Sequence, residues 1–270
     1  MRIAIVSLTE EGLKTAQRIG AGFRPPPSMY VFKKIGEETD SIPEDKPLPH
    51  IIPFPEPLQQ LVSRIFKQFD GLIFIMAIGI VVRVIAPHIQ DKHTDPAIVV
   101  VDDVGRFVIS LLSGHEGGAN LLAHKVAAIM HTDAVITTGT EAQKDIIIGV
   151  GCKKGVNSEV VKQSIMNALQ RVNLTIEHVR LLSTIEIKSE EPGLLQAAEE
   201  LGIPLRIVSC QEIGTCAKEY SKSNFVKEKI GVGGVCEPSA LIAGRKTQLI
   251  LKKQKYPGVT VAIAQENFTW

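Results

Sequence analysis

The sequence predicts an α/β fold made of two domains in tandem, each with a small, mostly parallel sheet flanked by helices. Apolar runs rich in β-branched residues alternate with segments of helical spacing, which indicates strands alternating with helices. After a short polar stretch at residues 141–145, the pattern of strand, glycine-rich turn and helix begins again. We therefore expect an N-terminal domain over residues 1–142 and a C-terminal domain over residues 146–270.

In the N-terminal domain, each strand is predicted from a short apolar run. These runs cover residues 3–8, 30–32, 71–76, 97–101, 107–112 and 134–137. Thr9 is expected to cap the first helix, because a threonine side chain can accept a hydrogen bond from the first turn. Residues 37–57 are rich in proline and charge, which predicts a loop rather than a core element. Turn residues at 102–105 predict a hairpin between the runs on either side.

In the C-terminal domain, two strands and a closing hairpin are predicted. They cover residues 146–150, 205–208, 248–252 and 259–264. Asn157 is expected to cap the helix that begins at Ser158. Pro192 suits the first position of a further helix. Ser209 and Glu212 have the spacing of a capping box.

Bulk composition excludes several classes of partner. The formal net charge is +1 and aromatic residues make up 5%, so nothing indicates a surface for nucleic acid or an acidic membrane. The apolar run at 71–87 contains Arg83 and several glycine and proline residues, and falls short of a membrane span. Residues 1–11 lack the features of a secretion signal. We expect a cytoplasmic protein whose four cysteines are reduced thiols.

The first candidate site is Ser113-Gly114-His115-Glu116-Gly117-Gly118-Ala119-Asn120, where a predicted strand passes into a helix. Its glycines let the backbone approach a ligand closely, and free N–H groups at the helix start would bind an anion. His115 is suited to proton transfer, and Glu116 beside it can adjust that behaviour. The alternative is a tight turn in which His115 is hydrogen-bonded to the backbone.

The second candidate site is Gly149-Val150-Gly151-Cys152-Lys153-Lys154-Gly155, which also joins a predicted strand to a helix. Exposed N–H groups and lysines at such a turn suit a phosphate or a carboxylate. The spacing matches neither the Walker A motif nor the dinucleotide-binding motif. Solvated lysines in an ordinary turn are the alternative interpretation.

The third candidate site is Gly231-Val232-Gly233-Gly234-Val235-Cys236-Glu237-Pro238-Ser239-Ala240. Glu237, at the mouth of a glycine turn, can act as a general base or cap a helix. Cys236 is a candidate nucleophile, although the sequence identifies no partner histidine for it. The histidines of the chain lack zinc-binding spacing, so we expect no metal site.

Taken together, these stretches resemble the cobalt-precorrin-5A hydrolases of anaerobic cobalamin synthesis, a family often called CbiG. The resemblance covers nearly the whole chain in the order of the family. It is carried by residues 75–87, 91–102, 110–120, 149–155, 231–238, 252–255 and 259–264, and by Lys188 with Glu191. The usual members have a further central segment, whereas here Thr138 is followed almost at once by the strand at Ile146. The chain therefore resembles a compact form of the family.

The resemblance implies a hydrolase that opens the lactone of cobalt-precorrin-5A and releases acetaldehyde, leaving cobalt-precorrin-5B. It implies no cofactor and no metal held by the protein, because the substrate brings its own cobalt. The expected partner is a cobalt-corrinoid small molecule, with no nucleic acid and no membrane. A homodimer and contacts with other enzymes of the cobalamin pathway are left open.

The resemblance also implies roles for residues of the candidate sites. A base is required, and the candidates are His115 first, then Glu237 and Glu116. The acetate and propionate arms of the substrate suit cations and glycine-rich turns. The residues expected to bind it are Arg83, Lys92, Ser113, Gly114, Gly117, Gly118, Asn120, Gly151, Cys152, Lys153, Lys154, Gly233 and Gly234.

Two further hypotheses stay open at this stage. A non-catalytic corrinoid-binding or carrier protein of the same pathway would hold the intermediate without converting it. A nucleotide-binding protein would use the turn at 149–155, although the absence of Walker spacing disfavours it.

Overall fold

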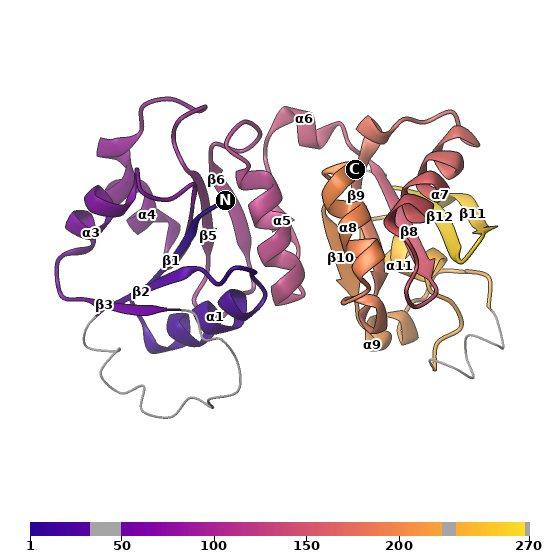
Figure 1. Ribbon diagram of the computed structural model, residues 1–270, viewed down its shortest axis with the longest axis horizontal. Helices are drawn as coiled ribbons and strands as arrows, with labels where there is room; N and C mark the ends of the chain where they lie inside the picture. The colour runs from indigo at the N-terminus through magenta and orange to yellow at the C-terminus, as the bar shows by residue number, and fades with distance from the viewer. Residues whose placement is uncertain (33–49, 223–230, 268–270) are drawn as a thin grey trace. The chain divides into compact units, whose positions relative to one another are not determined.

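The computed structural model describes residues 1–32, 50–222 and 231–267, and the chain forms two compact units, Met1–Thr138 and Gly139–Trp270 (Figure 1). Each unit is a sheet flanked by helices, which confirms the predicted α/β class. The second unit begins with the short helix α6 (Gly139–Ala142), which includes the first two residues of the stretch predicted as a linker.

The sheet of the first unit has the strand order β3-β2-β1-β4-β5-β6-β7 over the described residues. Its strands are β1 (Ile3–Ser7), β2 (Ser28–Phe32), β3 (Ile51–Phe54), β4 (Gly71–Ile75), β5 (Ala97–Val101), β6 (Val108–Leu112) and β7 (Ala134–Val135). All neighbours are parallel except β5 and β6, which form the predicted hairpin. Because β6 is antiparallel to β1, β4 and β5, it ends at the edge of the sheet where those strands begin. We call this edge the amino edge.

Helices cover both faces of this first sheet. Helices α1 (Glu10–Ala21) and α5 (Ala119–Met130) pack on the face that carries Ile5 and Val99. Helices α3 (Leu58–Ile65) and α4 (Ile78–Ile85) pack on the face that carries Val6. Alternate residues of a strand point to opposite faces, so one sheet serves two hydrophobic cores. The hydroxyl of Thr9 accepts a hydrogen bond from the N–H of Gly12, which confirms the predicted cap of α1.

The prediction of a loop over residues 37–57 is wrong for its last part. Residues 51–54 form β3, and Phe54 is buried in the core. Strand β3 is the outermost strand of the sheet, where a proline such as Pro53 is tolerated because one side of the strand needs no ladder hydrogen bonds. Residues 37–49 lie outside the described part of the chain.

The sheet of the second unit has the strand order β10-β9-β8-β12-β11 over the described residues. Its strands are β8 (Ile146–Cys152), β9 (Val179–Ile185), β10 (Leu205–Val208), β11 (Gln248–Tyr256) and β12 (Val259–Gln265). The strands β8, β9 and β10 are parallel, and β11 and β12 form the predicted hairpin, antiparallel to β8 through β12. This sheet is therefore mixed rather than mostly parallel, and it contains β9, which the sequence analysis missed.

The second sheet also has a helix layer on each face. Helices α7 (Ser158–Gln170) and α8 (Pro192–Leu201) cover the face of Ile148, and α11 (Cys236–Ile242) covers the face of Ile147. The short helix α9 (Cys210–Gly214) follows β10. The predicted cap at Asn157, the proline start of α8 and the capping box of Ser209 with Glu212 are confirmed.

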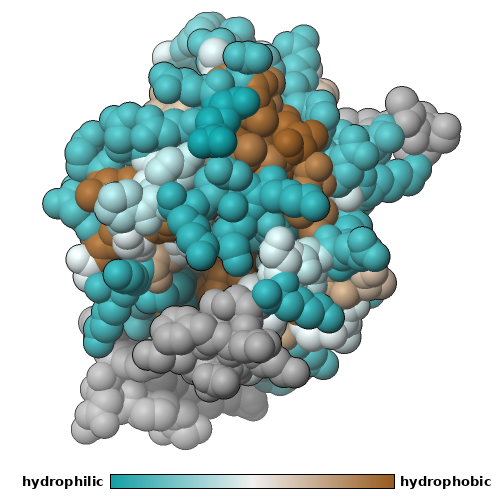
Figure 2. Space-filling model, turned by 90° about the vertical axis from the view of Figure 1, so that its right-hand side faces the viewer, coloured by the Kyte–Doolittle hydropathy of each residue, from teal (hydrophilic) through white to brown (hydrophobic). Residues whose placement is uncertain are grey.

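Hydrophilic side chains cover much of the face shown in Figure 2, and hydrophobic ones gather in smaller areas between them. On α4, the apolar residues Ile78, Ile80 and Val82 are exposed. Among the described residues, no helix combines the length and the apolar character needed to cross a membrane.

Candidate functional site

The turn at residues 113–118 joins the end of β6 to the start of α5 at the amino edge of the first sheet. Ser113 has φ +57° and Gly118 has φ +84°, so both have left-handed backbone conformations. A Cβ atom on Gly117 would lie 2.4 Å from Cβ of Ser113 and 2.9 Å from its carbonyl oxygen. The turn therefore requires glycine at 117, and it holds Ser113, a residue with a side chain, in a conformation that favours glycine.

The first two backbone N–H groups of α5 are bound within this segment, whereas N–H groups of the turn itself have no acceptor among the described residues. The N–H of Ala119 donates to the carbonyl of Ser113 (3.1 Å), and that of Asn120 donates to the carbonyl of Gly114 (2.9 Å). The backbone N–H of Glu116 is hydrogen-bonded to the carboxyl of its own side chain, whereas within the described part of the chain the N–H groups of residues 115, 117 and 118 bind no acceptor. A run of such donors can bind an anionic group of a ligand.

Asn120 is buried and holds the segment together rather than facing a ligand. Its Oδ1 accepts a hydrogen bond from Ser110 Oγ (2.8 Å), and its Nδ2 donates to Thr138 Oγ1 (2.9 Å). A Cβ atom on Gly114 would lie 2.9 Å from Asn120 Oδ1. The side chain therefore fastens α5 to β6 and to the end of the first unit, which makes its predicted role in binding an indirect one.

Lys92 and Glu116 come together at this turn, as an ion pair with 2.7 Å between Nζ and Oε1. The hydrogen bond from Lys92 lowers the pKa of the Glu116 carboxyl, and the same bond raises the pKa of Lys92. A carboxylate paired in this way is a weak base. His115 is exposed and binds no hydrogen-bond partner among the residues that the structure describes.

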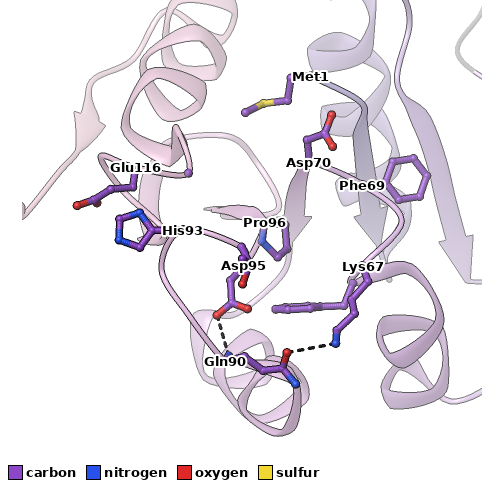
Figure 3. A pocket seen from close by; sticks show the side chains of 12 residues that line it. Met1, Lys67, Phe69, Asp70, Gln90, His93, Asp95, Pro96 and Glu116 are labelled. Atoms are coloured by element: carbon purple, nitrogen blue, oxygen red, sulfur yellow. Dashed lines mark hydrogen bonds between the residues drawn. The ribbon is translucent and has the colours of Figure 1, made fainter.

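A cavity of about 610 Å³ lies at the amino edge beside this turn (Figure 3), within the range of small-molecule pockets. Its lining combines four apolar side chains with charged and polar groups. The lining residues are Met1, Phe66, Lys67, Phe69, Asp70, Gln90, His93, Thr94, Asp95, Pro96, Glu116 and Gly117. Glu116 and Gly117 are the predicted site residues among them. Arg83 is exposed on α4, donates to the carbonyl of Gly79 in its own helix (3.3 Å) and does not line this cavity.

In the second unit, hydrogen bonds to other segments of the same unit hold the glycine-rich turn at 151–155 in place. The N–H of Lys153 donates to the carbonyl of Gly258 (2.9 Å), and the N–H of Gly155 donates to Glu191 Oε1 (2.7 Å). A carboxylate of the protein thus binds a backbone donor that a phosphate would need, which disfavours the nucleotide hypothesis. The side chains of Lys153 and Lys154 are exposed and available to acidic groups.

The two glycine-rich stretches of the second unit lie against each other. A Cβ atom on Gly151 would lie 3.4 Å from Val235 Cβ, and one on Gly149 would overlap the carbonyl oxygen of Cys236. Gly233 and Gly234 pack in turn against Tyr220 and the neighbouring backbone. Both stretches were predicted as parts of a site, and the structure brings them together at the end of β8.

Glu237 is buried, and the structure favours an anchoring role over the predicted role of general base. Its Oε1 accepts hydrogen bonds from the N–H of Lys253 (2.7 Å) and from Ser221 Oγ (3.2 Å), and its Oε2 accepts from the N–H of Ser221. Burial raises the pKa of this carboxyl, but the hydrogen bonds from Lys253 and Ser221 outweigh burial and lower the pKa overall. The carboxylate therefore binds α11 to β11 and to the segment at 221.

The thiols of this region are poor nucleophiles. Burial raises the pKa of Cys236 and of Cys152 to about 11 in each case, so both thiols are protonated at neutral pH. Within residues 1–32, 50–222 and 231–267, no three His, Cys, Asp or Glu side chains are grouped so as to hold a metal ion.

Sequence analysis missed three residues that the structure places at these sites. His93 lines the cavity, and Glu191 and Lys188 lie against the turn at 151–155. The resemblance includes all three, but no residue pattern assigned a role to them. Their positions depend on contacts between segments that are far apart in the sequence, such as Gly155 with Glu191.

The fold is that of a two-unit α/β protein, and its first unit contains a cavity of a size that suits a small molecule. The family model "Cobalamin synthesis G N-terminal" matches residues 60–141, and "Cobalamin synthesis G C-terminus" matches residues 146–264. Together the two models match most of the chain. It belongs to the cobalamin synthesis G family.

Two curated relatives are similar over nearly their whole length. The "Cobalt-precorrin-5A hydrolase" of Priestia megaterium is 27% identical over 97% of this chain and 94% of the relative. The protein of the same name from Salmonella typhimurium is 24% identical over 97% of both chains. The solved structure of CobE, a protein from the cobalamin (vitamin B12) biosynthetic pathway, is 23% identical over 45% of this chain and 90% of that chain, with a TM-score of 0.43.

The chain is shorter than its Priestia relative. Their alignment extends over 360 positions against the 270 residues of this chain, so at least 90 positions of the relative have no counterpart here. The two family models match ranges separated only by residues 142–145.

Proposed function

We propose that this protein hydrolyses cobalt-precorrin-5A, opening its lactone and releasing acetaldehyde to give cobalt-precorrin-5B. One observation carries the proposal, which is the similarity to curated cobalt-precorrin-5A hydrolases over 97% of the chain. The order of the two family domains along the chain agrees with it.

The turn at 113–118 and the cavity beside it are the site that best suits this reaction. The free N–H groups of residues 115, 117 and 118 and the ammonium of Lys92 suit the acidic arms of a corrinoid. In the second unit, Lys153 and Lys154 are further cations for such arms. His115, the base proposed from the sequence, is exposed and carries no competing hydrogen bond within the described residues.

We propose that the protein needs no cofactor of its own, because the substrate carries the cobalt. We also propose that it acts in the cytoplasm. All four cysteines are free thiols, which agrees with a reducing compartment.

A carrier role is the second candidate function. It is favoured by the 90 or more positions of the Priestia relative that this chain lacks. If the residues at those positions contribute catalytic groups, the compact chain would bind the corrinoid without converting it.

The test is anaerobic incubation of the purified protein with cobalt-precorrin-5A, with released acetaldehyde as the readout. The wild type is compared with His115→Ala and with His50→Ala, an exposed histidine that does not line the cavity. Acetaldehyde from the wild type and from the His50 variant supports the hydrolase. Retention of the corrinoid on the protein without any acetaldehyde would replace it by the carrier.

A further inference from the structure

The cavity at the amino edge contains one histidine among its lining residues, and it is His93 rather than His115. His93 lies in the segment that leads into β5. The N–H of His93 donates to Asp91 Oδ1 (2.8 Å), and the carbonyl of Asp91 accepts hydrogen bonds from Thr94 (3.1 Å) and Asp95 (2.8 Å). The backbone that carries the imidazole is therefore held in a tight turn.

The buried carboxylate of Asp95 also holds the backbone of this segment in place. Oδ2 of Asp95 accepts hydrogen bonds from the N–H groups of Gln90 (2.8 Å) and Asp91 (3.0 Å), and Asp95 is only 6% exposed. These bonds define the path of residues 90–95 along the cavity. A catalytic side chain works best on such a supported backbone, because its position is set before the substrate arrives.

His93 lies beside Glu116 (Figure 3), and the two interact electrostatically. Glu116 is ion-paired to Lys92, so it remains a carboxylate. A carboxylate beside an imidazole can orient the ring for proton transfer. His93 therefore lies beside a carboxylate in the wall of the cavity, whereas His115 does not line the cavity.

We propose that the cavity receives the lactone-bearing edge of the corrinoid and that His93 is the catalytic residue that takes the proton from the attacking water. This inference rests on the proposed hydrolase function and deepens it. The proposed base of lactone opening is thus a histidine that was not among the candidates from the sequence.

The step balances with water as the only co-reactant. The oxygen of water bonds to the lactone carbonyl carbon while one of its protons moves to the imidazole of His93. The carbon–oxygen bond of the ring then breaks, and its electron pair leaves with the alkoxide oxygen. That oxygen takes the proton back from His93, which yields a carboxylic acid and an alcohol. The N–H of Gly117, which lines the cavity without an acceptor in the described residues, is a donor for the developing oxyanion.

The lining of the cavity suits this edge of the substrate. Met1 and Phe69 offer apolar surface for the macrocycle, and Phe66 and Pro96, which are buried, close the wall behind them. Polar groups occupy the remaining wall, as is common in pockets that both bind and orient a ligand.

Several charged groups lie around His93 and along the cavity. They come from its own segment, from the turn and from the cavity wall. They are Asp91, Lys92, Asp95, Glu116, Asp70 and Lys67. Asp70 is bound to Arg2, and Lys67 donates to Gln90, so Glu116 is the charge that we expect to act most directly on His93.

The test compares wild-type protein with His93→Gln and His93→Ala for acetaldehyde release from cobalt-precorrin-5A across pH. Replacing a general base is expected to lower kcat roughly 100- to 10,000-fold with little change in corrinoid binding. Added imidazole is expected to restore part of the activity of His93→Ala. Glu116→Gln is expected to shift the acidic limb of the pH profile, because a general base loses activity when it is protonated. The matched control His50→Gln should retain wild-type rates.

The outcomes separate the two proposals. If the wild type turns over and His93→Gln keeps its rate within about threefold, or if imidazole has no effect on His93→Ala, His93 is not the base and the hydrolase proposal stands. If the wild type releases no acetaldehyde, the hydrolase proposal fails and the role of His93 fails with it. His93 is exposed, so unchanged thermal unfolding of the variants is expected to exclude a folding defect.

Discussion

The carboxylate of Glu191 accepts a hydrogen bond from the backbone N–H of Gly155, with 2.7 Å between Oε1 and N. The other oxygen lies 3.4 Å from Nζ of Lys188, and the Glu191 side chain is only 5% exposed. Glu191 precedes α8, yet its side chain makes no cap for that helix and reaches the turn that follows β8 instead. The shape of this turn is therefore set by a residue 36 positions away.

Glu191→Ala is expected to destabilise the second unit. It removes the charged acceptor of the Gly155 N–H and of the Lys188 ammonium, and hydrogen bonds to a charged group contribute about 1.5–3 kcal/mol. The free energy of unfolding is measured by urea denaturation. Glu190→Ala is the control, because Glu190 is exposed and its loss should change little. Equal stability of the two variants would contradict the anchoring role.

Most of the first unit was predictable from the sequence because its strands are short apolar runs. Strand β9 was missed because its polar residues are buried. The hydroxyl of Thr184 donates to the carbonyl of Val150 (2.8 Å), and Arg180 is ion-paired to Glu266 (2.6 Å). These polar residues are paired with residues far away in the sequence, and they interrupt the apolar run that would mark a strand. The spacing of apolar residues alone therefore does not identify β9.

Gly149→Ala is expected to unfold or strongly destabilise the second unit. A Cβ atom there would lie 1.8 Å from the carbonyl oxygen of Cys236, so β8 and α11 would have to separate. Overpacking of a core costs about 1–3 kcal/mol, and contact with backbone leaves little room for relief. Circular dichroism during thermal unfolding measures the effect. Gly214→Ala, with no atom within 4 Å of its new Cβ, is the control. A stable Gly149 variant would show that α11 does not lie on Gly149.

The sequence predicted where the glycine-rich turn of the candidate site lies, but not the cavity beside it or the roles of its polar side chains. The turn at 113–118 was found because glycines cluster where a strand meets a helix. The cavity was not, because it forms only when the antiparallel β6 places this turn beside the segment before β5. The roles of Glu237 and Asn120 depend on partners such as Ser221 and Thr138, which no local pattern identifies.

The stability of the protein is expected to depend on Glu237 in a pH-dependent manner. Its folded-state pKa lies below the ordinary value of 4.5, so its contribution is present above that value and is lost as pH falls through the folded pKa. Glu237→Gln should therefore cost about 1–3 kcal/mol at pH 7, from weakened hydrogen bonds to a charged group. The difference from wild type should shrink below pH 4.5, as followed by urea midpoints from pH 7 to pH 3. A difference independent of pH would contradict a charged Glu237.

Ser113→Gly is expected to stabilise the first unit while harming the site. Ser113 has φ +57°, and a residue with a side chain held there costs about 1–3 kcal/mol, of which the greater flexibility of unfolded glycine offsets about 0.5–1 kcal/mol. Its hydroxyl is buried without a hydrogen-bond partner, so removing it breaks no bond.

We therefore expect the midpoint of thermal unfolding of Ser113→Gly to rise by about 3 °C. Ser110→Ala makes the matched comparison, because the Ser110 hydroxyl is bonded to Asn120 and its loss should lower the midpoint. If the strained serine is retained for the reaction, the more stable Ser113 variant should release acetaldehyde more slowly than wild type. A lower midpoint for Ser113→Gly would mean that the left-handed serine stores no strain, and an unchanged rate would remove Ser113 from the site.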